Sequence, residues 1–297
     1  MTELDLVAES ASDLGADPAR AATVARIEVA VGSHCVSGLH WGRGDPEVVF
    51  LHGGGQNAHT WDALLLQTDF PAVAFDLPGH GRSSWRTDGL YLPRDIAPTL
   101  AAAVEAVAPN ARGVVGMSLG GLAGLVLGAT RPDITRRLVV VDVSPASTPE
   151  RSRQITSFAA LGPFPSFDDM VSHAERYRPS APRRALRRAV YYNAQRRPDG
   201  QWEWRHDRRD VAGGDRMAPV FADLPSYWET VAEVACPTLL VVGGRSPIVT
   251  PADVERYRAL LPGIEVVEIE GARHSVQGDR PRELAQLLQG FLELGER

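Results

Sequence analysis

Ser118 lies at the centre of the sequence Gly116-Met117-Ser118-Leu119-Gly120, which matches the pattern G-x-S-x-G. The β-branched residues 114–115 precede it, and residues 122–129 form an apolar stretch of helical length after it. A strand, a tight turn and a helix in this order hold a serine in a strained conformation with its hydroxyl exposed. The glycines leave room for the turn, and the helix start offers free N–H groups. The pattern predicts a nucleophilic serine; the alternative is an ordinary glycine-rich turn.

A nucleophilic serine needs a base within hydrogen-bond reach and an acid that orients the base. His274 follows the last apolar run of the chain, residues 266–269. An α/β sheet places its site at the carboxyl ends of the strands, so a loop after the last strand can reach the serine. The chain order serine, acid, histidine also fits this fold. We therefore predict that His274 is the base, against the alternative of an ordinary surface-loop histidine.

The predicted acid is Asp142. The loop at residues 243–247, which follows the apolar run 239–242, contains no carboxylate. Asp142 directly follows the run 138–141, one strand beyond that of the serine. The alternative is a structural aspartate that holds a turn. Asp253 is the second choice for the acid, although the sequence places it in a helix.

An oxyanion formed at the serine needs two N–H donors. We predict that they belong to Leu119, next to the serine, and to Gly54, in the glycine-rich loop at residues 52–57. His52 in that loop is interpreted as a brace of the loop. The histidines of the chain show no metal-ligand spacing, so no metal and no other cofactor is predicted.

Six short apolar runs indicate strands buried on both faces, as in a parallel sheet. They are residues 48–51, 72–75, 114–115, 138–141, 239–242 and 266–269. Helix-length segments separate most of them, at residues 61–66, 93–108, 119–131 and 253–261. This alternation predicts the α/β class, with a doubly wound, mostly parallel sheet. Residues 27–39 are expected to form an antiparallel pair at its edge.

The alternation stops near residue 146, and residues 146–218 are predicted to be a mainly helical cap inserted into a core of residues 26–145 and 219–297. The insertion holds 14 arginines against nine acidic residues. Helices are expected at 167–177 and 182–195, with a turn at 198–200. Four aromatic residues are candidates for the lining of a substrate pocket, namely Phe158, Phe164, Tyr191 and Trp202. The alternative is that they pack a small core of the cap itself.

The composition of the chain excludes several classes of chemistry. Its 297 residues include 31 basic side chains, all of them arginine, so Schiff-base, pyridoxal phosphate and P-loop lysine chemistry are absent. The net charge of −6 disfavours nucleic acid as a partner. Two distant cysteines, Cys35 and Cys236, favour a reducing compartment over a disulfide framework. The acidic, alanine-rich residues 1–25 form an extension, frayed or a short helix, to which the sequence assigns no chemistry.

Neither a signal peptide nor a membrane span is predicted, so the expected location is the cytoplasm and no membrane is expected as a partner. The sequence makes no prediction of the oligomeric state.

These motifs together resemble the α/β-hydrolase superfamily. The matching pieces are the loop His52-Gly53-Gly54-Gly55, the turn at residues 76–83, the serine motif and Gly271-x-x-His274. The resemblance implies the α/β-hydrolase fold. Many members carry the acid where this chain has Ser246, but some esterases and lactonases carry it one strand after the nucleophile, as Asp142 would be. A serine nucleophile argues against the haloalkane dehalogenase and epoxide hydrolase branches.

The leading hypothesis is a serine hydrolase that cleaves a small carboxylic ester or lactone. Ser118 attacks, His274 transfers the proton, Asp142 holds the imidazole, and Gly54 and Leu119 stabilise the oxyanion. Hydrolysis of a carbon–carbon bond or a thioester, and cofactor-free perhydrolysis, are variants of the same chemistry. A slow-turnover ligand receptor that keeps the triad is the alternative outside enzymes.

Overall fold

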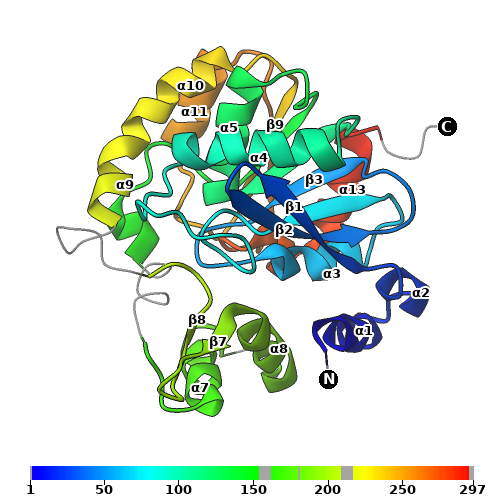
Figure 1. Ribbon diagram of the computed structural model, residues 1–297. Helices are drawn as coiled ribbons and strands as arrows, with labels where there is room; N and C mark the ends of the chain where they lie inside the picture. The colour runs from blue at the N-terminus through cyan, green and yellow to red at the C-terminus, as the bar shows by residue number, and fades with distance from the viewer. Residues whose placement is uncertain (1, 154–161, 180, 209–216, 294–297) are drawn as a thin grey trace.

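An eight-stranded sheet forms the centre of the molecule (Figure 1). The computed structural model describes residues 2–153, 162–179, 181–208 and 217–293. The strands of the sheet are β1 (Ala25–Val31), β2 (His34–Trp41), β3 (Val48–Leu51), β4 (Ala72–Phe75), β5 (Gly113–Met117), β6 (Leu138–Val141), β9 (Thr238–Gly243) and β10 (Glu265–Ile269). Their spatial order is β1-β2-β4-β3-β5-β6-β9-β10.

All neighbouring strands from β4 to β10 are parallel, and only β2 runs antiparallel to its neighbours β1 and β4. The six predicted apolar runs and the predicted edge pair are all present as strands. The predicted doubly wound, mostly parallel sheet is therefore confirmed. Because parallel strands end at the same edge, the segments that follow β3, β5, β6 and β9 meet there. We call this edge the carboxyl edge.

Helices cover both faces of the sheet. One apolar cluster joins one face to α4 (Pro93–Val107), α5 (Leu119–Thr130), α10 (Tyr227–Glu233) and α11 (Pro251–Leu260). A second cluster joins the other face to α1 (Glu3–Leu14), α2 (Pro18–Ala21), α3 (Asp62–Leu65), α12 (Val276–Asp279) and α13 (Pro281–Phe291). Side chains along β3 alternate between the two clusters, as the pleat of a strand buried on both faces requires. The short helices η1 (Ala58–Trp61), η2 (Leu224–Ser226) and α9 (Met217–Asp223) complete the set of described elements of the core.

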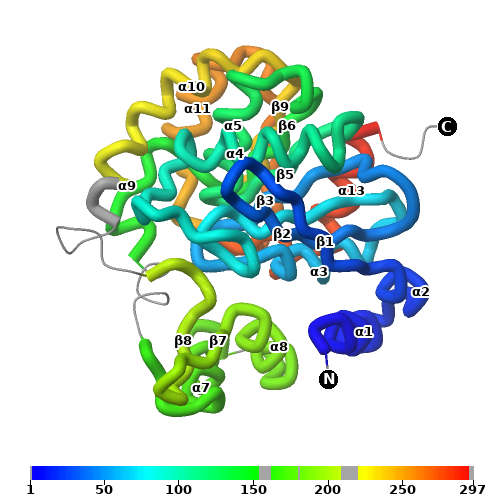
Figure 2. Tube along the Cα trace, in the orientation of Figure 1, coloured from blue at the N-terminus to red at the C-terminus, as the bar shows by residue number. Residues whose placement is uncertain are grey.

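Between β6 and β9 the chain leaves the sheet and forms a small second body. It contains α7 (Phe167–Tyr177), α8 (Arg183–Asn193) and the antiparallel pair β7 (Ala194–Arg196) and β8 (Trp202–Trp204), with an apolar cluster of its own. Figures 1 and 2 show it set apart from the layered core and next to α1. We call α7, α8, β7 and β8 the cap body. Helix α8 ends two residues earlier than predicted, because Ala194 begins a strand that pairs with β8.

Candidate active site

Ser118 occupies a sharp turn between β5 and α5, with φ 52° and ψ −118°. Such a left-handed φ is uncommon for a residue with a Cβ, and it is the strain expected of an exposed nucleophile. Its backbone N–H donates to the carbonyl of Val141, 3.1 Å away. The glycines make the turn possible, since a Cβ at Gly116 would lie 2.2 Å from the carbonyl oxygen of Gly120, and one at Gly120 would lie 2.3 Å from that of Leu51.

Asp142 follows β6 and is fully buried. Its φ of 49° is also left-handed, and its backbone N–H donates to Val241, 2.8 Å away. The carboxylate accepts three hydrogen bonds. Gly243 N–H donates to Oδ1 at 3.0 Å, and Oδ2 accepts from the Ser246 hydroxyl at 2.5 Å and from Nδ1 of His274 at 2.8 Å. The strand register sets Met117 opposite Val141, so Asp142 and Ser118 follow neighbouring strands.

His274 lies in the loop between β10 and α12, and about 15% of its side chain is exposed. Its contact with Asp142 uses Nδ1, which must carry the proton to donate to a carboxylate. Nε2 of the neutral ring is then free to accept a proton, which is the arrangement that a general base requires. Among the described residues no hydrogen bond joins Nε2 to the Ser118 hydroxyl. Such contacts often tighten only when substrate binds.

Ser246 is the functional candidate that the sequence reasoning missed. It stands where many relatives in the resembled superfamily carry the acid, and here its hydroxyl donates to the acid candidate Asp142. The sequence feature that could have indicated this role is a hydroxyl side chain in the loop that follows β9 at the carboxyl edge. Asp253, the second choice for the acid, lies elsewhere. It caps α11 through Thr250 and pairs with Arg151 at 2.8 Å.

The backbone N–H groups of the two predicted oxyanion donors have no acceptor within the described part of the chain. Among the described hydrogen bonds none is donated by the N–H of Gly54 or of Leu119. Leu119 is the first residue of α5, where a helix leaves its N–H groups free. Gly53 brings this loop close to the serine, because a Cβ on Gly53 would come 3.2 Å from Cβ of Ser118. The N–H of Gly53 itself donates to Oε1 of Gln56 at 3.1 Å.

His52 braces the glycine-rich loop and is not placed to act as a base. The fully buried ring accepts a hydrogen bond at Nε2 from Leu77 N–H, 2.9 Å away, and Nδ1 donates to the carbonyl of Gly53 at 2.7 Å. Burial, with a smaller contribution from His80, holds the pKa of His52 well below its usual value. A neutral ring suits both contacts, because only the neutral form has one donor and one acceptor nitrogen.

The four predicted pocket residues lie in different surroundings. Phe164 and Trp202 pack in the apolar cluster of the cap body, and their backbones pair in an isolated bridge. Tyr191 is 41% exposed and contacts Tyr192 edge-on. Phe158 lies outside the described residues. Their role in lining a pocket remains a prediction.

Within the described part of the chain, no group of three or more His, Cys, Asp or Glu side chains is arranged to hold a metal ion. No described helix is long and apolar enough to cross a bilayer. The two cysteines are free thiols.

The alpha/beta hydrolase family model matches residues 48–287, which include the strands from β3 to β10, the candidate site and the cap body. The chain therefore belongs to the alpha/beta hydrolase family.

Among individual relatives, the chain is 38% identical to Esterase Rv0045c of Mycobacterium tuberculosis over 303 residues, which covers 99% of this chain and 96% of the relative. A solved structure of that esterase superposes with a TM-score of 0.82 and covers 99% of both chains. The 2-(acetamidomethylene)succinate hydrolase of Mesorhizobium japonicum is 27% identical, with 84% of this chain and 88% of the relative covered. A pimeloyl-[acyl-carrier protein] methyl ester esterase of Aeromonas salmonicida is 26% identical, with 86% and 99% covered.

Proposed function

We propose that this member of the alpha/beta hydrolase family is a carboxylic ester hydrolase that works through an acyl-enzyme formed on Ser118. The observation that carries the proposal is the 2.8 Å contact between Nδ1 of His274 and the buried carboxylate of Asp142, at the edge where the strained Ser118 begins its helix. The kinship with a named esterase over nearly the whole of both chains supports ester cleavage. The substrate class is a small carboxylic ester or lactone.

In the first half of the reaction the Ser118 hydroxyl attacks the ester carbonyl carbon while Nε2 of His274 takes its proton. The carbonyl oxygen becomes an oxyanion, which the N–H groups of Gly54 and Leu119 stabilise by hydrogen bonds. His274 then gives the proton to the leaving alkoxide, the ester C–O bond breaks, and an acyl-Ser118 ester remains. Asp142 holds the ring in the required tautomer and stabilises its protonated form.

In the second half a water molecule attacks the acyl carbon, and His274 removes its proton. The second oxyanion uses the same two N–H donors. Its collapse breaks the bond to Ser118 Oγ, which recovers the proton from His274, and the carboxylic acid leaves. We propose that the insertion at residues 146–218 acts as a cap that selects the acyl or alcohol part and takes no part in proton transfer.

The decisive experiment replaces the nucleophile. Ser118→Ala is expected to lower kcat for p-nitrophenyl esters by about 10⁶ while the protein stays folded, because the serine and the histidine act as one unit. A fluorophosphonate should label Ser118 in the parent protein and leave the variant unlabelled. Ser33→Ala, in the exposed turn between β1 and β2, is the matched control and should behave like the parent.

A Ser118→Ala variant that keeps more than about a hundredth of the parent rate would be incompatible with the proposal. A stoichiometric burst without further turnover, on both p-nitrophenyl esters and lactones, would instead favour a ligand receptor that keeps the triad.

A further inference from the structure

Helix α1 belongs to the extension to which the sequence assigned no chemistry, yet one of its carboxylates enters the core. We propose that Glu3 is a positioning residue for the ester hydrolysis described above. It ties the segment that follows the Gly54 loop to cap helix α8, so that the oxyanion donor and the cap are held in one arrangement. The inference rests on the proposed function and adds to it a source of alignment outside the motifs of the site.

Glu3 is the meeting point of cationic side chains from three parts of the chain. Its Oε1 accepts from Nε of Arg26 at 3.0 Å, and Oε2 accepts from Nη2 of Arg82 at 2.7 Å. Nε2 of His59 lies 3.7 Å from Oε2. Burial alone would raise the pKa of Glu3, but the nearby His59 and the hydrogen-bonded Arg26 outweigh it and hold that pKa far below its usual value. The carboxylate is therefore ionised. Loss of its cationic partners would destabilise the fold, because burying an unpaired charge costs free energy.

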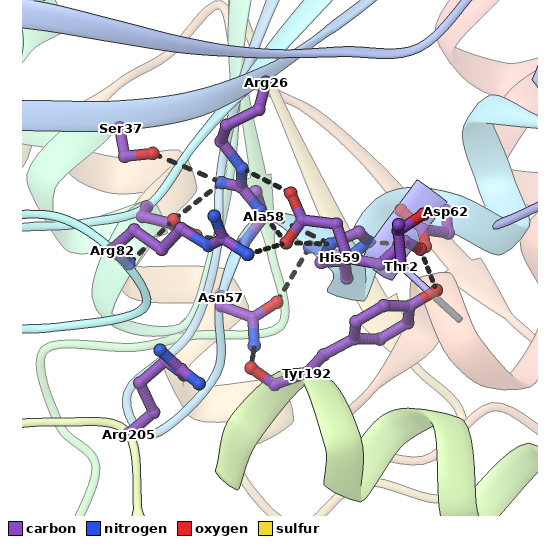
Figure 3. Close-up of polar contacts among 12 residues, drawn as sticks. Thr2, Arg26, Ser37, Asn57, Ala58, His59, Asp62, Arg82, Tyr192 and Arg205 are labelled. Atoms are coloured by element: carbon purple, nitrogen blue, oxygen red, sulfur yellow. Dashed lines mark hydrogen bonds and ion pairs between the residues drawn. The ribbon is translucent and has the colours of Figure 1, made fainter. Parts of the chain in front are cut away.

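The second connection runs from His59 to the cap body. The ring of His59 stacks on the ring of Tyr192, with centroids 3.6 Å apart and planes 5° apart, and the Tyr192 hydroxyl donates to the backbone carbonyl of Glu3 at 3.3 Å. Figure 3 shows Arg26 and Arg82 converging beside His59, with the side chain of Tyr192 extending from α8 on the cap side. Tyr192 belongs to α8. Glu3 therefore contacts both rings of the stack, His59 through its carboxylate and Tyr192 through its backbone carbonyl.

Asn57 links this cluster to the loop of the candidate oxyanion site. Its Oδ1 accepts from His59 N–H at 2.9 Å and so starts η1. Its Nδ2 donates to the carbonyl of Tyr192 at 2.9 Å and to Oδ1 of Asn193 at 2.8 Å. Gly54 is only three residues before Asn57. A shift of η1 or of α8 is therefore expected to displace the N–H of Gly54, since only a short stretch of backbone separates Gly54 from Asn57.

A third contact between α1 and α8 does not involve the loop. Asp13, near the end of α1, pairs with Arg188 and, at 2.9 Å, with Arg184. Asp13 touches the cap body only, whereas Glu3 touches both the cap body and the segment after Gly54. Variants of these two carboxylates can therefore distinguish the placement of the cap, which involves both, from the placement of the oxyanion donor, which involves Glu3 alone.

The test measures kcat and KM of Glu3→Gln and Asp13→Asn with p-nitrophenyl acetate, butyrate and octanoate, at a temperature where circular dichroism shows each variant folded. Glu3→Gln should lower kcat about tenfold for every chain length, because a shift of about 1 Å at an aligned group can cost up to about a hundredfold. Asp13→Asn should leave kcat within about twofold and change the ratio of KM values between octanoate and acetate about threefold. Glu255→Gln, in an exposed pair with Arg258, is the control and should match the parent.

A double-variant cycle shows whether Glu3 acts through the ring stack. Glu3→Gln combined with Tyr192→Leu should be no slower than the slower single variant. If the losses in kcat of the two single variants multiply in the double variant, the inference is overturned. It is also overturned if Glu3→Gln folds with a lowered Tm but keeps the kcat of the parent, because Glu3 is then a structural residue only. If Glu3→Gln does not fold, Tyr192→Leu decides, because it removes the ring stack and keeps the Glu3 carboxylate; a kcat equal to that of the parent would then overturn the inference. Ser118→Ala, assayed in parallel, separates this failure from failure of the proposed function, since only the latter leaves Ser118→Ala active.

Discussion

The carboxyl edge of the sheet and the cap body are held in place by different interactions. At the edge, Ser118 and Asp142 directly follow strands whose residues are all buried, and backbone hydrogen bonds to the neighbouring strands fix their positions. The cap body has a small apolar cluster of its own. Side-chain contacts such as Arg188 with Asp13 and Asn57 with Asn193 join it to the rest of the chain. A backbone bridge between His80 and His206 adds a contact just after β8.

This difference predicts a division of labour. Shifting a central strand breaks several buried backbone hydrogen bonds together, and each buried group left unpaired costs about 1–3 kcal/mol. An ion pair whose arginine is largely exposed, such as Arg184 with Asp13, contributes only about 0–1 kcal/mol, so we expect the cap body to shift at lower cost than a central strand. We therefore expect substitutions at the carboxyl edge to change the chemical step, and substitutions in the contacts of the cap body to change alignment, substrate preference and stability.

The largest effect in this comparison is expected from Asp142→Asn. The amide keeps the shape of the side chain, and asparagine tolerates the left-handed backbone of this position, so the fold should persist. The variant can no longer stabilise the protonated ring of His274, and kcat should fall on the order of 10⁴ if the analogy with the serine-protease acid holds. Steady-state kinetics on p-nitrophenyl butyrate measure the loss.

Asp253→Asn is the matched control for the acid. Asp253 caps α11 and pairs with Arg151, so its variant should lose some stability and keep a kcat near that of the parent. If Asp253→Asn shows the large loss and Asp142→Asn does not, the acid has been assigned to the wrong strand.

A smaller effect at the same edge is expected from Ser246→Ala. The change removes one of three hydrogen bonds to the Asp142 carboxylate, and a hydrogen bond to a charged group is worth about 1.5–3 kcal/mol. If about half of this free energy stabilises the transition state, its loss should lower kcat about tenfold. The loss should vanish when Ser246→Ala is added to Asp142→Asn, because Ser246 acts through the carboxylate. Ser226→Ala, in a polar contact with Arg94, is the control. Equal losses in both backgrounds would mean that Ser246 acts in another way.

The smallest effect concerns stability in the cluster between α1 and the cap body. Burial alone would lower the pKa of His59, but the nearby carboxylates of Asp62 and Glu3 outweigh both burial and Arg26 and raise that pKa above its usual value. A raised pKa means that protonated His59 stabilises the fold fully below about pH 6.5, the value in the unfolded chain, and that this contribution is lost as the pH rises through the raised pKa. The Tm advantage of the parent over His59→Gln should therefore shrink by a few degrees between pH 6 and pH 10. Thermal unfolding followed by circular dichroism tests this, and an advantage that stays constant or grows with pH would contradict it.

The sequence was informative where structure depends on neighbouring residues. All six runs were found as strands of the sheet, and five of them are buried on both faces as predicted. The sixth, β10, was wrongly predicted to be buried, because it forms an edge of the sheet and exposes Glu265 and Glu268. The site candidate Ser118 came from a short motif, and Asp142 and His274 came from their places after such runs. The family model and the relatives confirm the fold and the superfamily that these motifs indicated.

The remainder depends on contacts between distant residues. Glu3 lies 23 residues from Arg26 and 79 from Arg82, and Asn57 is 136 residues from Asn193. No periodicity or local motif encodes such pairs, so the extension was assigned no chemistry. The contact between Ser246 and Asp142 was missed for the same reason, since 104 residues separate them.

The placement of Ser118 and Asp142 has a consequence for how this enzyme can diversify. Both follow strands of one β–α–β unit, β5, α5 and β6, and a single strand register sets their separation. The insertion of the cap begins only after this unit. Its length and sequence can change, by evolution or by domain exchange, without altering that register. The β5–α5–β6 unit thus holds the proposed nucleophile and the proposed acid in one register, and insertions of different length after β6 leave that register unchanged.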